Sequence, residues 1–390
     1  MAETTTTTAS AVLKINYIGP IRNQLNKDTI LMDRIKKSSR EVSGSQVNIP
    51  LWSSYGSGVG ARTEGDDLPA AGGQSYDVST FTTKNIYGRF QVSGKTIRAT
   101  RNDTGAFVRI TKAEMMGKTT AMSRQMNRMH FVGSTGVIAT ENGGGANSAT
   151  QTFDRTQYFH EDQIVTFSTA GNATVSSIDD ANRQVTFTAA INVASGETVT
   201  VEGATSGEEL NGLAQFAAIT GAVQNLNPAT AGQGFWAGQV RGADASPVQW
   251  NELTTIRLIH DIRKKGGKPD YCITSYEGLA EIFNVLSAQR QFVNTVKLKG
   301  GFDAIIINGM PVVADDQCQV TNTVTRLYAA DTSNLGHYTQ ESFHWMDYDG
   351  NVFSRVADKD AYEATLVWDG EFATDARNHV GVQLGVQVNS

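Results

Sequence analysis

A long glycine-rich segment separates two strand-like runs in the first quarter of the chain and limits the folds open to it. The first run covers Val47 to Trp52 and the second covers Phe81 to Ile97, and both alternate apolar with polar residues. Between them, Ser53 to Gly73 is rich in glycine and carries one arginine and three acidic residues. Loops longer than ~12–15 residues are uncommon inside compact domains. We therefore expect this segment to be an arm that becomes ordered on a neighbouring molecule.

A helical pattern follows, from about Asp103 to Val132. The segment has no proline, and its apolar residues recur at helical spacing. Asp103 or Thr104 is suited to cap the start of the helix, and Gly133 is suited to end it. A helix of about thirty residues would be ~45 Å long, well above the usual ~10–14 residues. We expect its buried stripe to consist of Val108, Met115, Met122, Met126 and Met129.

The order of arm, hairpin loop and long helix resembles the major capsid proteins of tailed bacteriophages, which have the HK97-type fold. Gly58 to Gly65, with Leu68-Pro69 and Tyr87-Gly88-Arg89, is similar to the extended-loop signature of one branch of that family. Ile18 to Asn26 is similar to the family's N-terminal arm, and Thr104 to Val108 is similar to the start of its spine helix. The resemblance implies an α+β chain that forms a shell and is not an enzyme.

The resemblance also implies a division of the chain into segments. These are an N-terminal arm (1–46), an extended loop hairpin (47–100), a spine helix (101–133), a peripheral domain (134–224), an axial domain (225–349) and a return to the peripheral domain (350–390).

Local patterns add detail to two of these segments. Short alternating runs between turn residues predict a small all-β insertion at about 158–203. It is either a scaffold element that buries its own core or a binding site for an accessory protein. Helical spacing in Asn251 to Lys265 and in Ser275 to Arg290 predicts two helices over a sheet. Phe353 to Val388 is expected to return to the sheet of the peripheral domain.

The net charge of −6 hides two basic regions, Lys14 to Arg40 and Arg101 to Arg128. They are either solvated faces, or surfaces that meet acidic parts of neighbouring subunits, or sites of sequence-independent contact with enclosed DNA. A pI near 5.6 argues against a dedicated nucleic-acid binder. The resemblance implies intersubunit contacts in the loop and in the arm, formed by Arg62, Glu64, Asp66, Asp67 and Leu68 and by Arg22, Lys27, Arg34, Lys36 and Lys37.

No catalytic, cofactor or metal motif is found. Gly88 to Thr96 ends like a phosphate loop, but five residues separate its glycines where four are needed, and the alternation predicts that Lys95 is a surface strand residue. The six histidines do not fall at metal-ligand spacing, and His130 is expected to be a charge at the helix C-terminus. Cys272 and Cys318 are expected to be buried free thiols.

Three functions remain open. The first is a structural subunit that self-assembles through hexamers and pentamers into an icosahedral phage head around double-stranded DNA. Its expected partners are itself, scaffolding and portal proteins, decoration proteins and non-specifically bound DNA, with assembly in the host cytoplasm and a final place in the virion. The second is an encapsulin-like compartment shell. The third is a glycan-acting hydrolase that uses Asp315 and Asp316. Because these two residues are adjacent in the chain, their side chains would point to opposite sides of a strand, which argues against this function.

Two further expectations concern the ends and the membrane. No apolar run approaches the ~18 residues of a membrane span, so no membrane partner is expected. The chain begins almost directly with the arm, which indicates either a separate scaffolding protein or a record of the mature form.

Overall fold

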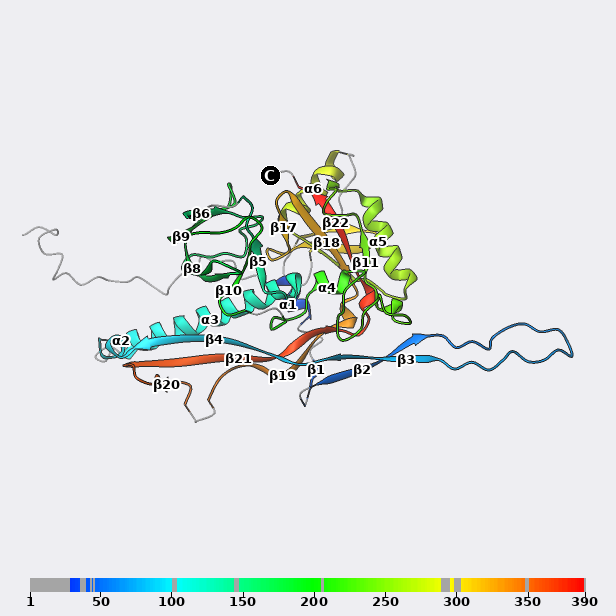
Figure 1. The fold of residues 1–390 in the computed structure, drawn as a ribbon, viewed down its shortest axis with the longest axis horizontal. Helices are drawn as coiled ribbons and strands as arrows, with labels where there is room; N and C mark the ends of the chain where they lie inside the picture. Colours follow the sequence, from blue (N-terminus) through cyan, green and yellow to red (C-terminus); the bar gives the residue numbers. More distant parts are fainter. Residues whose placement is uncertain are drawn as a thin grey trace, which may run out of the picture.

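The structure is a computed structural model that describes residues 29–35, 40–42, 44, 46–99, 104–143, 147–204, 207–288, 295–297, 303–347 and 351–388. The protein is elongated (Figure 1). One long helix and one long sheet run side by side, two further β-rich bodies lie on the helix side of that sheet, and a hairpin projects from one end.

Helix α3 (Thr104–Val132) is the predicted long helix, and its 29 residues confirm that prediction. It ends where expected, because Gly133 adopts a φ of +92° that favours glycine. Met122, Met126 and Met129 are buried, as the stripe predicts, and Met115 is partly buried. The side chain of Val108 and residue Asp103 lie outside the described part of the structure.

The long sheet has the order β1-β19-β21-β20, and β4 pairs with the other side of β21. Ten residue pairs join β4 to β21, from Gly370↔Lys84 to Ala361↔Ser93. Helix α2 (Gly94–Ala99) follows β4 directly at the end of the sheet opposite the hairpin (Figure 1). The strands are β1 (Arg40–Glu41), β4 (Lys84–Ser93), β19 (Leu335–Trp345), β20 (Ser354–Arg355) and β21 (Ala361–Thr374).

A nine-stranded sheet forms the second body, with the order β11-β22-β18-β13-β16-β15-β14 and two short strands at its margins. Helices α5 (Glu252–Lys264) and α6 (Tyr276–Ala288) cover one face, as their predicted spacing requires. The strands are β11 (Gln239–Arg241), β12 (Val248–Gln249), β13 (Tyr271–Thr274), β14 (Thr295–Lys297), β15 (Asp303–Ile307), β16 (Met310–Ala314), β17 (Val320–Thr321), β18 (Val324–Ala330) and β22 (Val380–Gln387).

The other face of this sheet packs on α3, on α1 (Ile30–Ile35) and on α4 (Leu213–Ala217). Alternate side chains of strand β13 are buried on opposite faces of the sheet. Tyr271 and Ile273 belong to the core against α3, and Cys272 belongs to the core against α5 and α6. Cys272 and Cys318 are buried free thiols, as expected. Short 3-10 helices lie at η2 (Gly234–Trp236), η3 (Thr332–Asn334) and η4 (Arg377–His379).

The third body is a six-stranded sheet with the order β5-β10-β7-β8-β9-β6. A bridge between Glu141 and Phe153 joins its two end strands, which closes the sheet into a small barrel. Its interior is filled by aromatic and valine side chains such as Phe167, Val175 and Phe187. The all-β character predicted for this region is confirmed, but the segment begins earlier, at β5, and its being an insertion stays a prediction. The strands are β5 (Val137–Thr140), β6 (Ser148–Thr152), β7 (Ile164–Phe167), β8 (Gly171–Asp179), β9 (Gln184–Ile191) and β10 (Thr198–Val201).

Two sheet assignments differ from the sequence prediction. The run from Phe353 to Val388 does not return to one sheet, because β21 lies in the long sheet whereas β22 pairs antiparallel with β18 in the nine-stranded sheet. Strand β19, expected in the axial segment, pairs with β21 in the long sheet. Sequence alternation identifies a strand but carries no information on its distant partner.

The predicted strand from Phe81 to Ile97 is also wrong as a single element. Strand β3 (Ser75–Phe81) starts six residues before the predicted run and pairs with β2 (Val47–Ser54). The chain then leaves this pair at Thr82 and Thr83, and β4 joins a different sheet. The last residues of the predicted run are helical, so Lys95 lies on α2 and not on a strand.

Candidate assembly interface

The hairpin β2–β3 forms a two-stranded sheet of its own and extends far beyond the rest of the molecule (Figure 1). Its base is attached at the end of β3. The ring of Phe81 packs edge-on against Tyr338 at 5.1 Å, and the amide of Thr80 donates to the carbonyl of Gln224 at 2.9 Å. The hairpin therefore leaves the body from a fixed point while most of its length has no neighbour in its own chain.

Beyond β2 and β3, residues 55–74 continue as a narrow tongue whose two sides run close together. A Cβ atom on Gly58 would lie 2.8 Å from the carbonyl oxygen of Ala70, and one on Gly72 would lie 2.7 Å from that of Ser57. Only glycine allows so close an approach of two backbones. This explains the glycine-rich sequence that predicted a long loop.

One face of the hairpin is apolar and exposed. Trp52 stands directly opposite Tyr76, and Pro50 directly opposite Val78, so all four share a face. The exposed fractions are 55% for Trp52, 70% for Tyr76 and 50% for Val78. Large apolar side chains gathered on one exposed face mark an interaction surface.

The hairpin tip, Arg62 to Leu68, is a tight turn with the predicted contact residues. Arg62 donates from Nε to the carbonyl of Asp67 at 3.1 Å, and Asp66 accepts from the hydroxyl of Thr63. Within the described part of the chain, Glu64 and Asp67 form no ion pair, and Leu68 is 87% exposed. The structure thus places all five predicted loop residues together on one exposed tip. Their contact with another subunit stays a prediction.

The predicted arm residues are placed only in part. Arg22, Lys27, Lys36 and Lys37 lie outside the described residues. Arg34 on α1 pairs with Asp270 at 2.7 Å and lies over the ring of Tyr271. Arg34 is therefore engaged within its own chain, and its contact with a neighbour remains a prediction.

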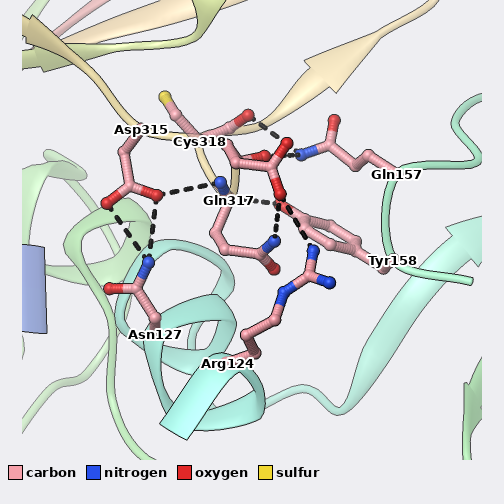
Figure 2. A network of polar contacts seen from close by, with 8 residues as sticks. Arg124, Asn127, Gln157, Tyr158, Asp315, Gln317 and Cys318 are labelled. Atoms are coloured by element: carbon pink, nitrogen blue, oxygen red, sulfur yellow. Dashed lines mark hydrogen bonds and ion pairs between the residues drawn. The ribbon is translucent and has the colours of Figure 1, made fainter. Parts of the chain in front are cut away.

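The loop 315–319 after β16 joins α3 to the barrel through side chains (Figure 2). Arg124 on α3 pairs with Asp316 at 2.9 Å. From the barrel side, Gln157 donates to the carbonyl of Cys318 at 3.0 Å, and the hydroxyl of Tyr158 donates to the carbonyl of Gln317 at 2.8 Å. The loop therefore holds the barrel against the helix.

Asp315, in the same loop, is buried and accepts hydrogen bonds from several directions. Its carboxylate accepts from Asn127 Nδ2 at 2.9 Å, from the amide of Gln317 at 2.9 Å and from the amide of Leu31 on α1 at 3.1 Å (Figure 2 shows the first two). Burial raises the pKa of Asp315, and these hydrogen bonds oppose that rise. Asp315 and Asp316 are thus both occupied in holding elements together, and no arrangement of a glycan-cleaving acid pair appears at this loop.

Two buried ion pairs were not predicted. Lys84 at the start of β4 pairs with Glu371 on β21 at 2.9 Å, and Arg128 on α3 pairs with Glu209. Glu371 and Arg128 are each about 1% exposed. Removing one partner of such a pair leaves a charge buried and is strongly destabilising. Charged residues are normally predicted to lie on the surface. The one signal in the sequence for their burial is that they occur at positions of a helix or strand whose neighbours on the same face are apolar.

His130 is not the helix-terminal charge expected from the sequence. It is fully buried, and its Nε2 atom lies 2.6 Å from the Nε2 atom of His337 on β19. Burial and the neighbouring imidazole hold the pKa of His130 well below its usual value, so the ring is neutral at neutral pH. Among the described residues, no group of three or more His, Cys, Asp or Glu side chains is placed to bind a metal ion.

Comparison with known proteins connects this architecture to viral and bacterial shells. No family model and no curated protein matches the sequence. The capsid of cyanophage A-1(L) matches with a TM-score of 0.64 at 13% identity, over 98% of this chain and 99% of the other. The capsid of a native GTA particle matches with a TM-score of 0.54 at 10% identity, over 99% and 100%.

A compartment shell matches as well. The SrpI encapsulin of Synechococcus elongatus PCC 7942 gives a TM-score of 0.53 at 9% identity, over 100% of this chain and 98% of the other. The chain thus has the fold of capsid and encapsulin shell subunits, and the resemblance read from the sequence is confirmed at the level of the fold.

None of the described helices combines the length and the apolar character needed to span a membrane.

Proposed function

We propose that the chain is the structural subunit of an icosahedral phage head that encloses double-stranded DNA and assembles through hexamers and pentamers. The observation that carries the proposal is the likeness to the cyanophage capsid, which covers nearly all of both chains and so includes the hairpin, the long helix and both large sheets.

The hairpin supports the same conclusion on physical grounds. Its exposed face and its tongue have no core of their own, and burying an aromatic side chain contributes roughly 1.5–3 kcal/mol. In a shell, a neighbouring copy supplies the missing surface for every hairpin at once. A repeated contact of this kind is what closed symmetric assembly requires.

In this proposal the two large bodies have separate places in the shell. The nine-stranded sheet with α5 and α6 is the axial domain, which meets its copies around the ring axes. Helix α3 and the long sheet form the peripheral domain. The arm at the start of the chain reaches a neighbour, and scaffolding, portal and decoration proteins join the assembly. Packaged DNA touches the inner face without sequence preference, and assembly takes place in the host cytoplasm.

An encapsulin-like compartment is the second candidate, because the SrpI encapsulin also matches over the whole chain. Such a shell would have the same subunit contacts but would enclose protein.

Three measurements test the proposal and separate the candidates. Electron microscopy of the purified protein should show closed shells of uniform size, and sedimentation should show a single fast species. Particles isolated after nuclease treatment should contain protected double-stranded DNA if the shell is a phage head. Shells with protein inside and no DNA would support the compartment instead. A monomer that never assembles would contradict both.

A further inference from the structure

The second half of α5 and the turn that follows it carry a concentrated positive charge. Residues 257–268 include five Lys or Arg residues and one acidic residue, although the whole chain has 33 Lys or Arg against 39 Asp or Glu. Apart from Gly266, every exposed residue in this range is basic. We call the six basic residues the α5 cationic surface, and they are Arg257, His260, Arg263, Lys264, Lys265 and Lys268.

The backbone under this surface is fixed. The amide of Gly267 donates to the carbonyl of Ile262 at 3.1 Å and so closes the end of the helix. Gly266 makes this turn with a φ of +94°. The amide of Lys268 donates to Oδ2 of Asp331 at 2.9 Å, which attaches the turn to the body of the protein. The basic side chains therefore start from an ordered scaffold.

The one acidic residue of this range is already neutralised. The carboxylate of Asp261 accepts a hydrogen bond from Nε of Arg241 at 2.6 Å and lies 3.7 Å from Nζ of Lys264. Four cations of the surface form no ion pair within the described part of the chain: Arg257, Arg263, Lys265 and Lys268.

Stabilisation of the helix explains only part of this cluster. Arg263 and Lys264 lie in the last turn of α5, where cations interact favourably with the free carbonyl groups of a helix. This effect falls off within one turn, so it does not account for Arg257 or for Lys268, which lies beyond the helix. Like charges held close together also repel each other, and an anionic partner would relieve that repulsion.

The surface suits a partner that is recognised by charge alone. Helix α5 lies on the side of the nine-stranded sheet that faces away from the barrel (Figure 1). The centres of protein–protein interfaces are rich in aromatic side chains and poor in charge, whereas the exposed residues of 257–268 show the opposite composition. Arg257 and Lys264 are seven residues apart on one side of the helix, a distance of ~10 Å along its axis. Duplex DNA carries one charge per ~1.7 Å of its axis, so a row of this length meets several phosphates.

We infer that the α5 cationic surface faces the interior of the shell and binds the phosphate backbone of the enclosed duplex DNA. The inference rests on the proposed function and specifies where the shell meets the DNA. The contact has no sequence preference, because it is made to phosphates. It weakens with salt, since each phosphate that is neutralised adds ~0.9 to the slope of log affinity against log salt.

A binding series with dissociated full-length subunits tests the inference. The variant Arg257→Gln with Lys268→Gln removes two unpaired cations of the surface. The control, Lys118→Gln with Arg183→Gln, removes the same charge from α3 and from the turn between β8 and β9. Fluorescence anisotropy of a labelled 30-base-pair duplex, measured from low to moderate salt, should show at least about tenfold weaker binding for the surface variant. Its salt slope should fall by about two, and the control should bind like the unmodified protein.

Particles test the same contact in the assembled state. The substituted side chains are exposed, so the surface variant should fold with an unchanged melting temperature and form normal shells. Cryo-electron microscopy of DNA-filled particles should show the first layer of DNA density against residues 257–268. Equal binding and equal salt slopes for the surface variant and the unmodified protein would overturn the inference.

Other results would overturn the inference while leaving the proposed function intact. A folded surface variant that fails to assemble would show that the α5 cationic surface is a contact between subunits. Protein density over residues 257–268, or exposure of these residues on the outside of DNA-filled shells, would show a different partner. The proposed function is decided separately, because it fails if the unmodified protein forms no shells or forms shells without DNA.

Discussion

Nε2 of His130 lies 2.6 Å from Nε2 of His337, so a helix residue and a strand residue 207 positions apart share one hydrogen bond inside the core. Phe372 packs against both rings, at centroid distances of 4.6 and 5.9 Å. A protonated ring would be a buried charge among these aromatic side chains. The pair therefore links the end of α3 to the long sheet in a way that depends on His130 being neutral.

This pair predicts a loss of stability in acid. In the unfolded chain a histidine takes up a proton near pH 6.5, but the lowered pKa of His130 keeps it neutral in the folded chain. Below pH ~6.5 the unfolded state binds more protons, so the free energy of unfolding falls as pH falls, by up to ~1.4 kcal/mol per pH unit from this group. His130→Gln retains a hydrogen-bond donor and should reduce that slope. Denaturant unfolding measured at several pH values checks the prediction, and equal slopes for the two proteins would contradict it.

The buried stripe of α3 predicts a sharp difference between two methionines six positions apart. Met122 is 5% exposed and Met116 is 59% exposed. Met122→Asp places a carboxylate in the core, at a cost of several kcal/mol, and should abolish soluble folded protein. Met116→Asp should change the free energy of unfolding by only about 0.5 kcal/mol. Solubility and circular dichroism of the two variants give the answer, and a folded Met122→Asp protein would show that the buried face is assigned wrongly.

How far the sequence predicts the structure is clearest at this helix. The methionine spacing, the absence of proline and Gly133 together predicted α3 closely, because its signals are local. Strands β7 to β10 of the barrel followed from alternation for the same reason, whereas β5 and β6 were not predicted. The separation of β3 from β4, the partner of β22 and the meeting of His130 with His337 did not follow, since each depends on contacts between distant segments.

At the candidate interface, too, features with a local sequence signal were predicted and features that depend on distant contacts were not. The glycine-rich tongue and its charged tip were recognisable, because such a sequence has no core of its own. Buried charges such as Lys84 and Arg128 were not, because a charged residue on a helix or strand is normally read as exposed. The ion pair of Arg124 with Asp316 could not be predicted either, because it depends on where the loop 315–319 lies in the fold.

Two adjacent glycines in the tongue should differ in their effect on assembly. A Cβ atom on Gly72 would lie 2.7 Å from the carbonyl oxygen of Ser57, whereas one on Gly73 would meet no atom within 4 Å. Gly72→Ala should therefore push the two sides of the tongue apart and reduce particle yield, with little change in the melting temperature of the monomer. Gly73→Ala is the matched control and should assemble normally. Equal yields from both variants would show that the shape of the tongue does not matter for assembly.

Single truncations at the hairpin tip separate folding from assembly. Arg62 and Glu64 lie far from any core, so Arg62→Ala or Glu64→Ala should leave the thermal unfolding of the monomer almost unchanged. Across a subunit boundary, loss of one partner of a desolvated charge pair costs ~2–5 kcal/mol, and each copy in a shell repeats the loss. We expect a collapse in particle yield or particles that dissociate in salt. Sedimentation and melting curves on the same preparations test this, and intact shells of normal salt tolerance from both variants would mean that the tip is a solvated surface.

Hydrogen exchange on residues 55–74 compares the hairpin in assembled particles with the hairpin in dissociated subunits. The tongue has few backbone partners and no core of its own, so its amides should exchange rapidly in the subunit. If the hairpin lies on a neighbouring copy, the same amides should be strongly protected in particles, while the amides of the α3 core are protected in both states. Equal and strong protection of the tongue in the dissociated subunit, or rapid exchange in intact particles, would contradict a shell held together by this hairpin.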